Sequence, residues 1–254
     1  MPRSPSELRE LVEAYLEELA PAPELGTLIE PLRYALGGKR VRPVLCLATA
    51  DALGLDVTEI LPAAAAVELV HSFSLVHDDL PALDDDRERR GAPSVWAAYG
   101  EATAILAGDA LLAEAMRLAL LYPTAAVARE LTMATLGMIG GQQLDLEGES
   151  DLARLHALKT GALFTAAIMC ALWAGEVPVD EHPPWRAFAG ELGLLFQVVD
   201  DLLDGDGYVN EVGADGARTM AGEAARRAQA RLEEIDADTG VLAEIVDGLA
   251  ARTA

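Results

Sequence analysis

Apolar residues recur at helical spacing along most of the chain, in runs separated by proline, glycine and short polar stretches. This period is typical of amphipathic helices. No run shows the apolar–polar alternation with hairpin turns that indicates strands. We therefore predict an all-α fold, with helices over residues 6–19, 27–36, 44–53, 63–79, 94–99, 101–121, 124–139, 151–157, 159–174, 184–204 and roughly 215–252.

Start signals support several of these helices. Ser6 and Glu7 open the first, and Pro43 and Pro62 occupy first-turn positions, where proline is favoured. The chain has 254 residues, of which 52% are apolar and only 5% aromatic, and it contains no internal repeat. Because this length and composition suit close-packed helices around one core, we predict that residues 1–254 form a single domain, a helical bundle.

An acidic segment closes the predicted helix 63–79, and it reads Asp78-Asp79-Leu80-Pro81-Ala82-Leu83-Asp84-Asp85-Asp86. His71, Ser74 and Asp78 share one face of that helix. Pro81 interrupts helical hydrogen bonding, which lets Asp84 turn back towards Asp78. The alternative is a solvated acidic helix end, with His71 as an ordinary core histidine.

A second acidic cluster, Asp200-Asp201-Leu202-Leu203-Asp204, closes the predicted helix 184–204. The helical wheel places its carboxylates on one stripe with Gly190, Gly193 and Gln197, opposite an apolar face formed by Leu192, Leu195, Phe196, Val199, Leu202 and Leu203. Like charges one turn apart repel by ~0.2–0.5 kcal/mol per exposed pair, so a cation is expected to offset them. Mg²⁺ is held by one or two carboxylates plus substrate phosphates. The two clusters therefore predict a shared metal–phosphate site.

Cations are scarce, and the only two lysines lie where anions could bind. Lys39 belongs to the glycine-entered basic loop Gly37-Gly38-Lys39-Arg40-Val41-Arg42-Pro43. Lys159 opens a predicted helix, where free N–H groups favour anions. The pair Arg89-Arg90 follows the first acidic cluster. Its alternative role is a salt-bridged loop beside Asp84–Asp86.

The net charge of −23 argues against nucleic acid and anionic membrane surfaces as partners, because both repel a polyanion. Asp51 and Glu68 interrupt the most apolar stretches, so we expect no integral membrane protein. Cys46 and Cys170 both lie in apolar stretches and are expected to be buried free thiols. Free thiols are typical of a reducing compartment, which makes the cytoplasm the expected location.

Taken in order, these segments resemble the trans-isoprenyl diphosphate synthases, the polyprenyl synthetase family. The resemblance runs from about Leu28 to Asp204. It rests on Gly-Gly-Lys-Arg-Val-Arg-Pro at 37–43, His-Asp-Asp-Leu-Pro-Ala-Leu-Asp-Asp-Asp at 77–86, Arg-Arg-Gly at 89–91, Leu-Ala-Gly-Asp-Ala-Leu at 106–111, Gly-Gly-Gln at 140–142, Lys-Thr-Gly at 159–161 and Phe-Gln-Val-Val-Asp-Asp-Leu-Leu-Asp at 196–204.

The resemblance implies a homodimeric enzyme with three Mg²⁺ per site, Mn²⁺ being an alternative metal, that joins isopentenyl diphosphate to an allylic diphosphate. The metals would be held by Asp78, Asp84 and Asp200, supported by Asp79, Asp201 and Asp204. Isopentenyl diphosphate would be bound by Lys39, Arg42, His71 and Arg90. The allylic diphosphate or its cation would be contacted by Arg89, Lys159, Thr160 and Gln197. Asp78, Asp84, Asp200 and Lys159 would be the catalytic residues.

In the family, the residues five and four positions before the first cluster limit product length. Here they are Phe73 and Ser74, and the bulky ring implies farnesyl diphosphate (C15), with geranylgeranyl diphosphate as the alternative. Family members also commonly carry lysines after the second cluster, which help to close the site. No lysine follows Asp204 here, so a weakly active or regulatory diphosphate-binding member is a further alternative. Terpene cyclases share the fold but generally carry a different second metal motif, and a plain acidic scaffold leaves the two lysines unexplained.

Overall fold

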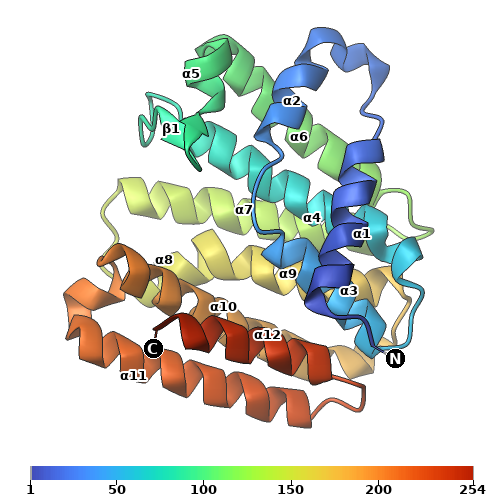
Figure 1. The fold of residues 1–254 in the computed structure, drawn as a ribbon, viewed down its shortest axis with the longest axis vertical. Helices are drawn as coiled ribbons and strands as arrows, with labels where there is room; N and C mark the ends of the chain where they lie inside the picture. The colour runs from blue at the N-terminus through green and yellow to red at the C-terminus, as the bar shows by residue number, and fades with distance from the viewer. Residues whose placement is uncertain (1, 254) are drawn as a thin grey trace.

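The computed structural model describes residues 2–253, and it confirms the all-α prediction (Figure 1). The helices are α1 (Pro5–Glu18), α2 (Ile29–Ala35), α3 (Val41–Ala52), α4 (Val57–Asp78), α5 (Val95–Tyr99), α6 (Glu101–Ala119), α7 (Ala126–Leu146), α8 (Leu152–His156), α9 (Ala162–Ala174), α10 (His182–Asp204), α11 (Tyr208–Glu233) and α12 (Gly240–Ala250). Short 3₁₀ turns occur at η1 (Pro23–Leu28), η3 (Val179–Glu181) and η4 (Ala251–Thr253), and a π-helical turn, η2 (Ala157–Gly161), joins α8 to α9.

Two helices form the centre of the bundle. Nearly every residue of α9 from Leu163 to Leu172 is buried, and α4 is buried on most sides between Val57 and Val76. A helix that is apolar all round belongs in a core. Helices α3, α6, α7 and α10 pack against this pair, and α11 with α12 covers the outer side of α10 (Figure 1). The arrangement leaves the ends of α4 and α10, which carry the acidic clusters, exposed at the rim of the core.

Helix α4 begins earlier than the sequence indicated. Asp56 caps it, because its side chain accepts hydrogen bonds from the backbone N–H of Thr58 at 2.9 Å and from the Thr58 hydroxyl at 2.7 Å. Pro62 therefore lies inside the helix rather than at its start. At the amino-terminal end of α1, the capping box is formed by Ser4 and Glu7, so Ser6 is not the start signal.

Two other boundaries also differ from the prediction. Helix α7 continues through Gly140-Gly141 to Leu146, and the run predicted over 215–252 is two helices, α11 and α12, separated by the turn at 234–239. A small antiparallel pair, β1 (Glu88–Arg89) with β2 (Ala92–Pro93), was not predicted at all. It turns the chain back after the first acidic cluster, and its two rungs carry no core residues.

The expectation that no segment could span a membrane was wrong by length and composition alone. Helix α4 and the continuous helical stretch Leu152–Ala174 are both long and apolar enough. Half or more of the most apolar stretch of each is buried inside the fold. Both are therefore core helices of the bundle and do not indicate a membrane protein.

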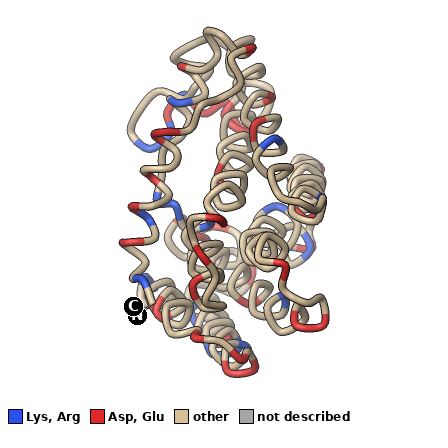
Figure 2. Tube along the Cα trace, turned by 90° about the vertical axis from the view of Figure 1, so that its right-hand side faces the viewer, with Lys and Arg blue, Asp and Glu red and all other residues tan. Residues whose placement is uncertain are grey.

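Acidic residues are spread over the whole molecule, with fewer basic ones among them (Figure 2). The basic side chains are not evenly distributed, because several of them gather around one cavity next to α3. That local concentration within an acidic protein marks the place to look for an anionic ligand.

Candidate active site

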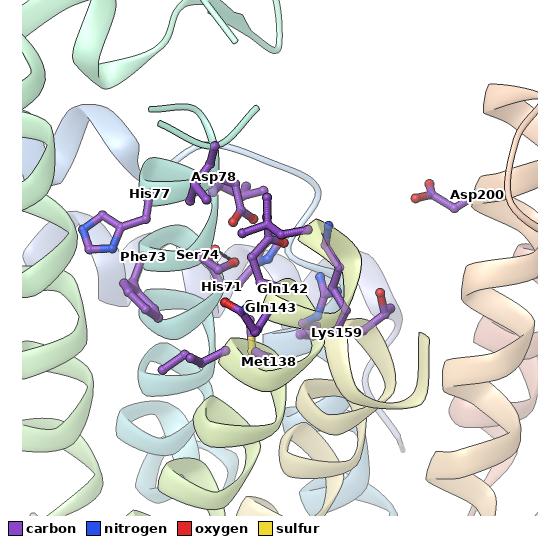
Figure 3. Close-up of a pocket in the computed structure, with 16 residues that line it drawn as sticks. His71, Phe73, Ser74, His77, Asp78, Met138, Gln142, Gln143, Lys159 and Asp200 are labelled. Atoms are coloured by element: carbon purple, nitrogen blue, oxygen red, sulfur yellow. Dashed lines mark hydrogen bonds between the residues drawn. The ribbon is translucent and has the colours of Figure 1, made fainter. Parts of the chain in front are cut away.

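A cavity of about 450 Å³ lies between α4, α7, η2 and α10 (Figure 3). Its polar lining combines Asp78 and Asp200, at the two acidic helix ends, with the cations Arg42 and Lys159. Apolar residues that include Phe73, Met138 and Ile139 form the rest of the wall. Figure 3 shows Asp78 and Asp200 on opposite sides, with Lys159 lying between them in this view. The cavity is lined by Arg42, His71, Phe73, Ser74, Leu75, His77, Asp78, Leu83, Met138, Ile139, Gln142, Gln143, Leu146, Lys159, Thr160 and Asp200.

The first acidic cluster is folded as predicted around Asp78. Helix α4 ends at this residue, before Pro81, and the backbone N–H of Asp84 donates to the carbonyl oxygen of Asp78 at 2.9 Å. Asp84 thus returns beside Asp78 at the rim. Burial, together with the neighbouring Asp84 and Asp79 carboxylates, raises the pKa of Asp78 to about 6, against the opposing effect of Lys159.

Asp79 faces away from the cavity. It is 2% exposed, and its carboxylate accepts a hydrogen bond from Nε of Arg89 at 2.9 Å. Arg89 also bonds Asp86 at 3.1 Å. The local ion-paired loop considered as the alternative role of Arg89 is therefore present, and Arg89 does not line either of the two cavities described for the site.

The second acidic cluster is divided between two surroundings. Asp200 is exposed to the cavity, and burial plus the Asp204 and Asp201 charges raises its pKa. Asp201, in contrast, is 3% exposed. The predicted stripe exists on α10 but does not serve a single site, because Gly190 and Gly193 line a separate cavity behind η2. Successive helical residues point about 100° apart, so Asp200 and Asp201 face different neighbours.

A second cavity, of about 290 Å³, adjoins the first and shares Arg42, His71 and Asp200 with it. Burial lowers the pKa of Arg42 to about 10, which leaves the guanidinium charged near neutrality. That guanidinium lies 4.6 Å from the ring centre of Phe164 and 5.6 Å from that of Phe196. Burial and the nearby arginines hold the pKa of His71 well below its usual range, so its imidazole is neutral. The remaining lining comprises Lys39, Arg40, Val41, Glu68, Arg90, Phe196, Leu203 and Arg252.

Arg40 fixes the basic loop from beneath. It is 5% exposed, adopts a left-handed backbone with φ of 57°, and donates to Glu68 at 2.7 Å and to Glu13 at 3.1 Å. A third hydrogen bond goes to the carbonyl oxygen of Leu36 at 2.9 Å. Because Arg40 points inwards, its neighbours Lys39 and Arg42 are free to face the cavity.

Lys159 and Thr160 lie in the π-helical turn rather than at the start of a helix, so the predicted helix-head anion site is wrong. Lys159 forms an ion pair with Asp145 of α7, and the Thr160 hydroxyl donates to Oε1 of Gln197 at 2.7 Å. A side chain at Gly141 would lie 2.5 Å from the backbone nitrogen of Lys159. The glycine thus permits the close approach of α7, and π-helical turns of this kind recur at functional sites.

The structure brings most of the predicted site residues to the two adjoining cavities. The larger cavity receives Asp78, Asp200, Lys159, Thr160, Phe73 and Ser74, the smaller receives Lys39 and Arg90, and both receive Arg42 and His71. Asp84 stands beside Asp78 at the rim. Asp79, Arg89, Gln197, Asp201 and Asp204 do not line either cavity.

Gln142 and Arg252 are among the lining residues that received no role from the sequence. The Oε1 atom of Gln142 is buried without a hydrogen-bond partner among residues 2–253, and Gln142 lines the larger cavity. The position of Gln142 in the Gly-Gly-Gln motif at 140–142 could have indicated a role in the site. Arg252 lines the smaller cavity but lies some 50 residues beyond the last motif, so only the packing of the carboxyl-terminal helices could reveal it.

The donor set suits Mg²⁺. The carboxylates of Asp78, Asp84 and Asp200 are hard oxygen ligands, and burial, followed by the neighbouring carboxylates, raises the pKa of Asp78, which a bound cation would counteract. Across the described part of the chain, no three His, Cys, Asp or Glu residues form a ready-made metal cluster. Mg²⁺ does not require one, because it is commonly bound through one or two carboxylates plus substrate phosphates.

Comparison with known proteins identifies the family. The polyprenyl synthetase model matches residues 26–218, well over half of the chain. The chain is 42% identical to geranylgeranyl diphosphate synthase of Cyanophora paradoxa, covering 78% of this chain and 72% of that protein. It is 38% identical to farnesyl diphosphate synthase of Haemophilus influenzae, covering 86% and 88%.

Solved structures agree. The fold superposes on a geranyltransferase from Legionella pneumophila with a TM-score of 0.88 at 34% identity, covering 98% of this chain and 96% of that one. A farnesyl/geranylfarnesyl diphosphate synthase from Zymomonas mobilis gives a TM-score of 0.83 at 33% identity, covering 95% of each chain. With the acidic helix ends facing each other across a cation-lined cavity, the chain belongs to the polyprenyl synthetase family of prenyltransferases.

Proposed function

We propose that the protein is a Mg²⁺-dependent head-to-tail prenyltransferase that condenses isopentenyl diphosphate with an allylic diphosphate to give a short-chain trans-prenyl diphosphate, farnesyl diphosphate (C15). The single observation that carries the proposal is the facing of Asp78 and Asp200 across one cavity that adjoins a second, cation-lined one. Relatives that are themselves farnesyl and geranylgeranyl diphosphate synthases support short-chain products.

The two cavities fit two diphosphate substrates. Lys39, Arg42 and Arg90 around the smaller cavity would hold the diphosphate of isopentenyl diphosphate, and neutral His71 can share a hydrogen bond with it. Lys159 and Thr160 would position the allylic diphosphate in the larger cavity. Asp78, Asp84 and Asp200 would hold the Mg²⁺, whose charge stabilises the departing diphosphate.

The side chains then control a reaction that passes through an allylic cation. The allylic C–O bond breaks and its electron pair leaves with the diphosphate. The double bond of isopentenyl diphosphate forms the new C–C bond, and loss of a proton restores a double bond. Fixed cations such as Lys159 are most valuable where negative charge grows in the transition state. Phe73, Met138 and Ile139 give the cavity an apolar wall, which would disfavour water that could otherwise trap the cation.

Product length is proposed to be limited by Phe73. Its ring is 8% exposed, lines the larger cavity and packs edge-on against His77 with ring centres 5.1 Å apart. A buried ring packed against His77 resists displacement by a growing prenyl chain, which favours C15. Geranylgeranyl diphosphate (C20) is the second candidate, because the small Ser74 lines the same cavity and the relative from Cyanophora paradoxa makes that product by name.

The proposal includes a homodimer in the cytoplasm. Exposed apolar residues on α6 and α7, each 46–62% exposed, form a face that a monomer would leave in water; they are Ile105, Leu106, Met133, Leu136 and Ile139. Ile139 also lines the larger cavity, so a second copy on this face would complete the apolar wall. The buried free thiols of Cys46 and Cys170 suit a reducing compartment.

One incubation tests the activity. Purified protein with Mg²⁺, isopentenyl diphosphate and dimethylallyl, geranyl or farnesyl diphosphate should give a chain-extended product, resolved by chromatography. Asp78→Ala and Asp200→Ala should each lower turnover by about 10²–10³-fold while remaining folded by circular dichroism. If none of the three allylic substrates is extended, the proposed prenyltransferase activity is refuted. Tight diphosphate binding by calorimetry without turnover would instead support the regulatory alternative.

A further inference from the structure

Four groups form an unbroken hydrogen-bond chain between the cavity and the start of α11. The Thr160 hydroxyl donates to Oε1 of Gln197 at 2.7 Å. Nε2 of Gln197 donates to Oδ1 of Asp201 at 2.7 Å. The other oxygen of Asp201, Oδ2, accepts the backbone N–H of Tyr208, the first residue of α11, at 2.8 Å. The chain therefore links the π-helical turn to the segment that follows the second acidic cluster.

Both carboxylate oxygens of Asp201 are thus occupied inside the protein. The residue is 3% exposed and does not line the larger cavity, whereas its neighbour Asp200 does. A hydrogen bond from a backbone N–H at a helix start to a carboxylate is charge-assisted and favoured by the helix dipole. Turning Asp201 towards a metal would break this bond and the one to Gln197.

The backbone after Asp204 is shaped around the same carboxylate. Gly207 has φ of 49°, and a Cβ atom placed on it would lie 2.2 Å from Oδ2 of Asp201. Gly205 also has a positive φ, of 77°, but a Cβ there would meet nothing within 4 Å. Of the two glycines, only Gly207 contacts Asp201, and its backbone (ψ −119°) also differs from that of Gly205 (ψ 29°).

We propose that Asp201 is a positioning residue and not a metal ligand: it ties the segment Gly205–Tyr208 to Gln197 and Thr160, so that the start of α11 is coupled to the allylic-diphosphate cavity. This chain has no lysine after Asp204. Where other family members use lysines to hold this segment against the site, the hydrogen bond from Tyr208 to Asp201 would hold it here. The link to substrate binding rests on the proposed function, while the hydrogen-bond chain itself does not.

The first test needs no turnover. Deuterium uptake by the peptide containing Tyr208 is compared in metal-free wild type, Asp201→Asn and the adjacent control Asp200→Asn. An asparagine at 201 can accept only one of the two hydrogen bonds and lacks the negative charge that strengthens the bond from Tyr208. We expect the Tyr208 amide to exchange about tenfold faster or more in Asp201→Asn and at the wild-type rate in Asp200→Asn. Equal protection in wild type and Asp201→Asn would overturn the proposal.

A steric pair keeps the test decisive if Asp201→Asn folds poorly. Gly207→Ala should push the Asp201 carboxylate away and reproduce the faster exchange, whereas Gly205→Ala should not. An alanine is also more strained at Gly207, where ψ is −119°, than at Gly205, where ψ is 29°, so Gly207→Ala is repeated in Asp201→Ala, where its added effect on exchange should be lost. Equal exchange in the two single alanine variants, or an equal effect of Gly207→Ala with and without Asp201, would refute a role for the Asp201 contact.

The second test separates positioning from metal binding. With wild-type activity established, Asp200→Asn should raise the half-saturating Mg²⁺ concentration. Asp201→Asn should leave that concentration unchanged and instead raise KM for the allylic diphosphate, since Thr160 loses its support. A Mg²⁺ requirement shifted as far in Asp201→Asn as in Asp200→Asn would identify Asp201 as a ligand and refute the proposal. If wild type makes no product, the proposed function fails and the exchange experiment still decides the role of Asp201.

Discussion

Asp78 should make the metal-free protein less stable than it would be with a neutral side chain at that position. Its pKa is raised from the ordinary 3.8 to about 6, first by burial and then by the nearby Asp84 and Asp79 carboxylates. The variant Asp78→Asn keeps the shape but removes the charge. We expect it to lose activity and to gain stability in the absence of metal.

The sign follows from proton binding. Between pH 3.8 and about 6 the folded state binds more protons at Asp78 than the unfolded state does, so stability falls as pH rises through this window. Above about pH 6 the ionised Asp78 destabilises the folded state by its full amount. At about 1.4 kcal/mol for each tenfold change in the ionisation constant, the gap amounts to about 3 kcal/mol. Asp78 is only partly buried, and solvent screening reduces the expected gain to about 1–2 kcal/mol.

Urea unfolding in EDTA at about pH 7 measures this gain, as does an increase of about 2–8 °C in Tm at fixed protein concentration. The difference between variant and wild type should disappear below about pH 3, where Asp78 is protonated in both the folded and the unfolded state. Asp180→Asn, at an exposed position, is the matched control and should change neither quantity. A variant that is less stable than wild type at neutral pH would refute the electrostatic account of this site.

Three further outcomes test other parts of the structure. Phe73→Ala should lengthen the product beyond C15 by chromatography, and an unchanged product would remove Phe73 from length control. Glu68→Gln should destabilise the protein by about 3–5 kcal/mol in urea, because Arg40 would lose its buried charge partner, and a change below 1 kcal/mol would contradict a loop-fixing role. Cys46 and Cys170, both buried with burial raising the pKa of each thiol, should react with a thiol reagent only after unfolding; rapid labelling of the native protein would contradict this.

The sequence predicted helix content well, and its errors have physical causes. Proline and glycine were treated as boundaries, yet Pro62 lies inside α4 and Gly141 inside α7. In α4, the Asp56 cap supplies an earlier start. In α7, packing against Lys159 needs a residue without a side chain, and this tertiary contact outweighs the ~1 kcal/mol that an interior glycine costs. Local propensity contains neither piece of information.

The sequence predicted which residue types form the site. It did not predict which of two adjacent charged residues faces the cavity and which is buried. The wheel gave Asp200 and Asp201 the same stripe, although consecutive residues differ by about 100° and the structure buries only Asp201. In the same way, the family resemblance assigned Lys39 and Arg42 to diphosphate binding. It did not indicate that Arg40, between them, turns inwards and binds Glu68. Which of two adjacent charges faces the ligand depends on a partner far along the chain.

A protein with a net charge of −23 can bind diphosphates only where its few cations outnumber the local acids. The smaller cavity meets that condition, because five of the 19 lysines and arginines line it, accompanied by only two carboxylates, Glu68 and Asp200. Of these two, Glu68 is already neutralised by Arg40. The larger cavity has no such excess, because Arg42 and Lys159 are matched there by Asp78 and Asp200, and Lys159 is already paired with Asp145. Under the proposed function, isopentenyl diphosphate would be held by side chains alone, whereas the allylic diphosphate would need divalent metal before it could approach. We therefore expect Mg²⁺ to be required for binding of the allylic substrate and not for binding of isopentenyl diphosphate.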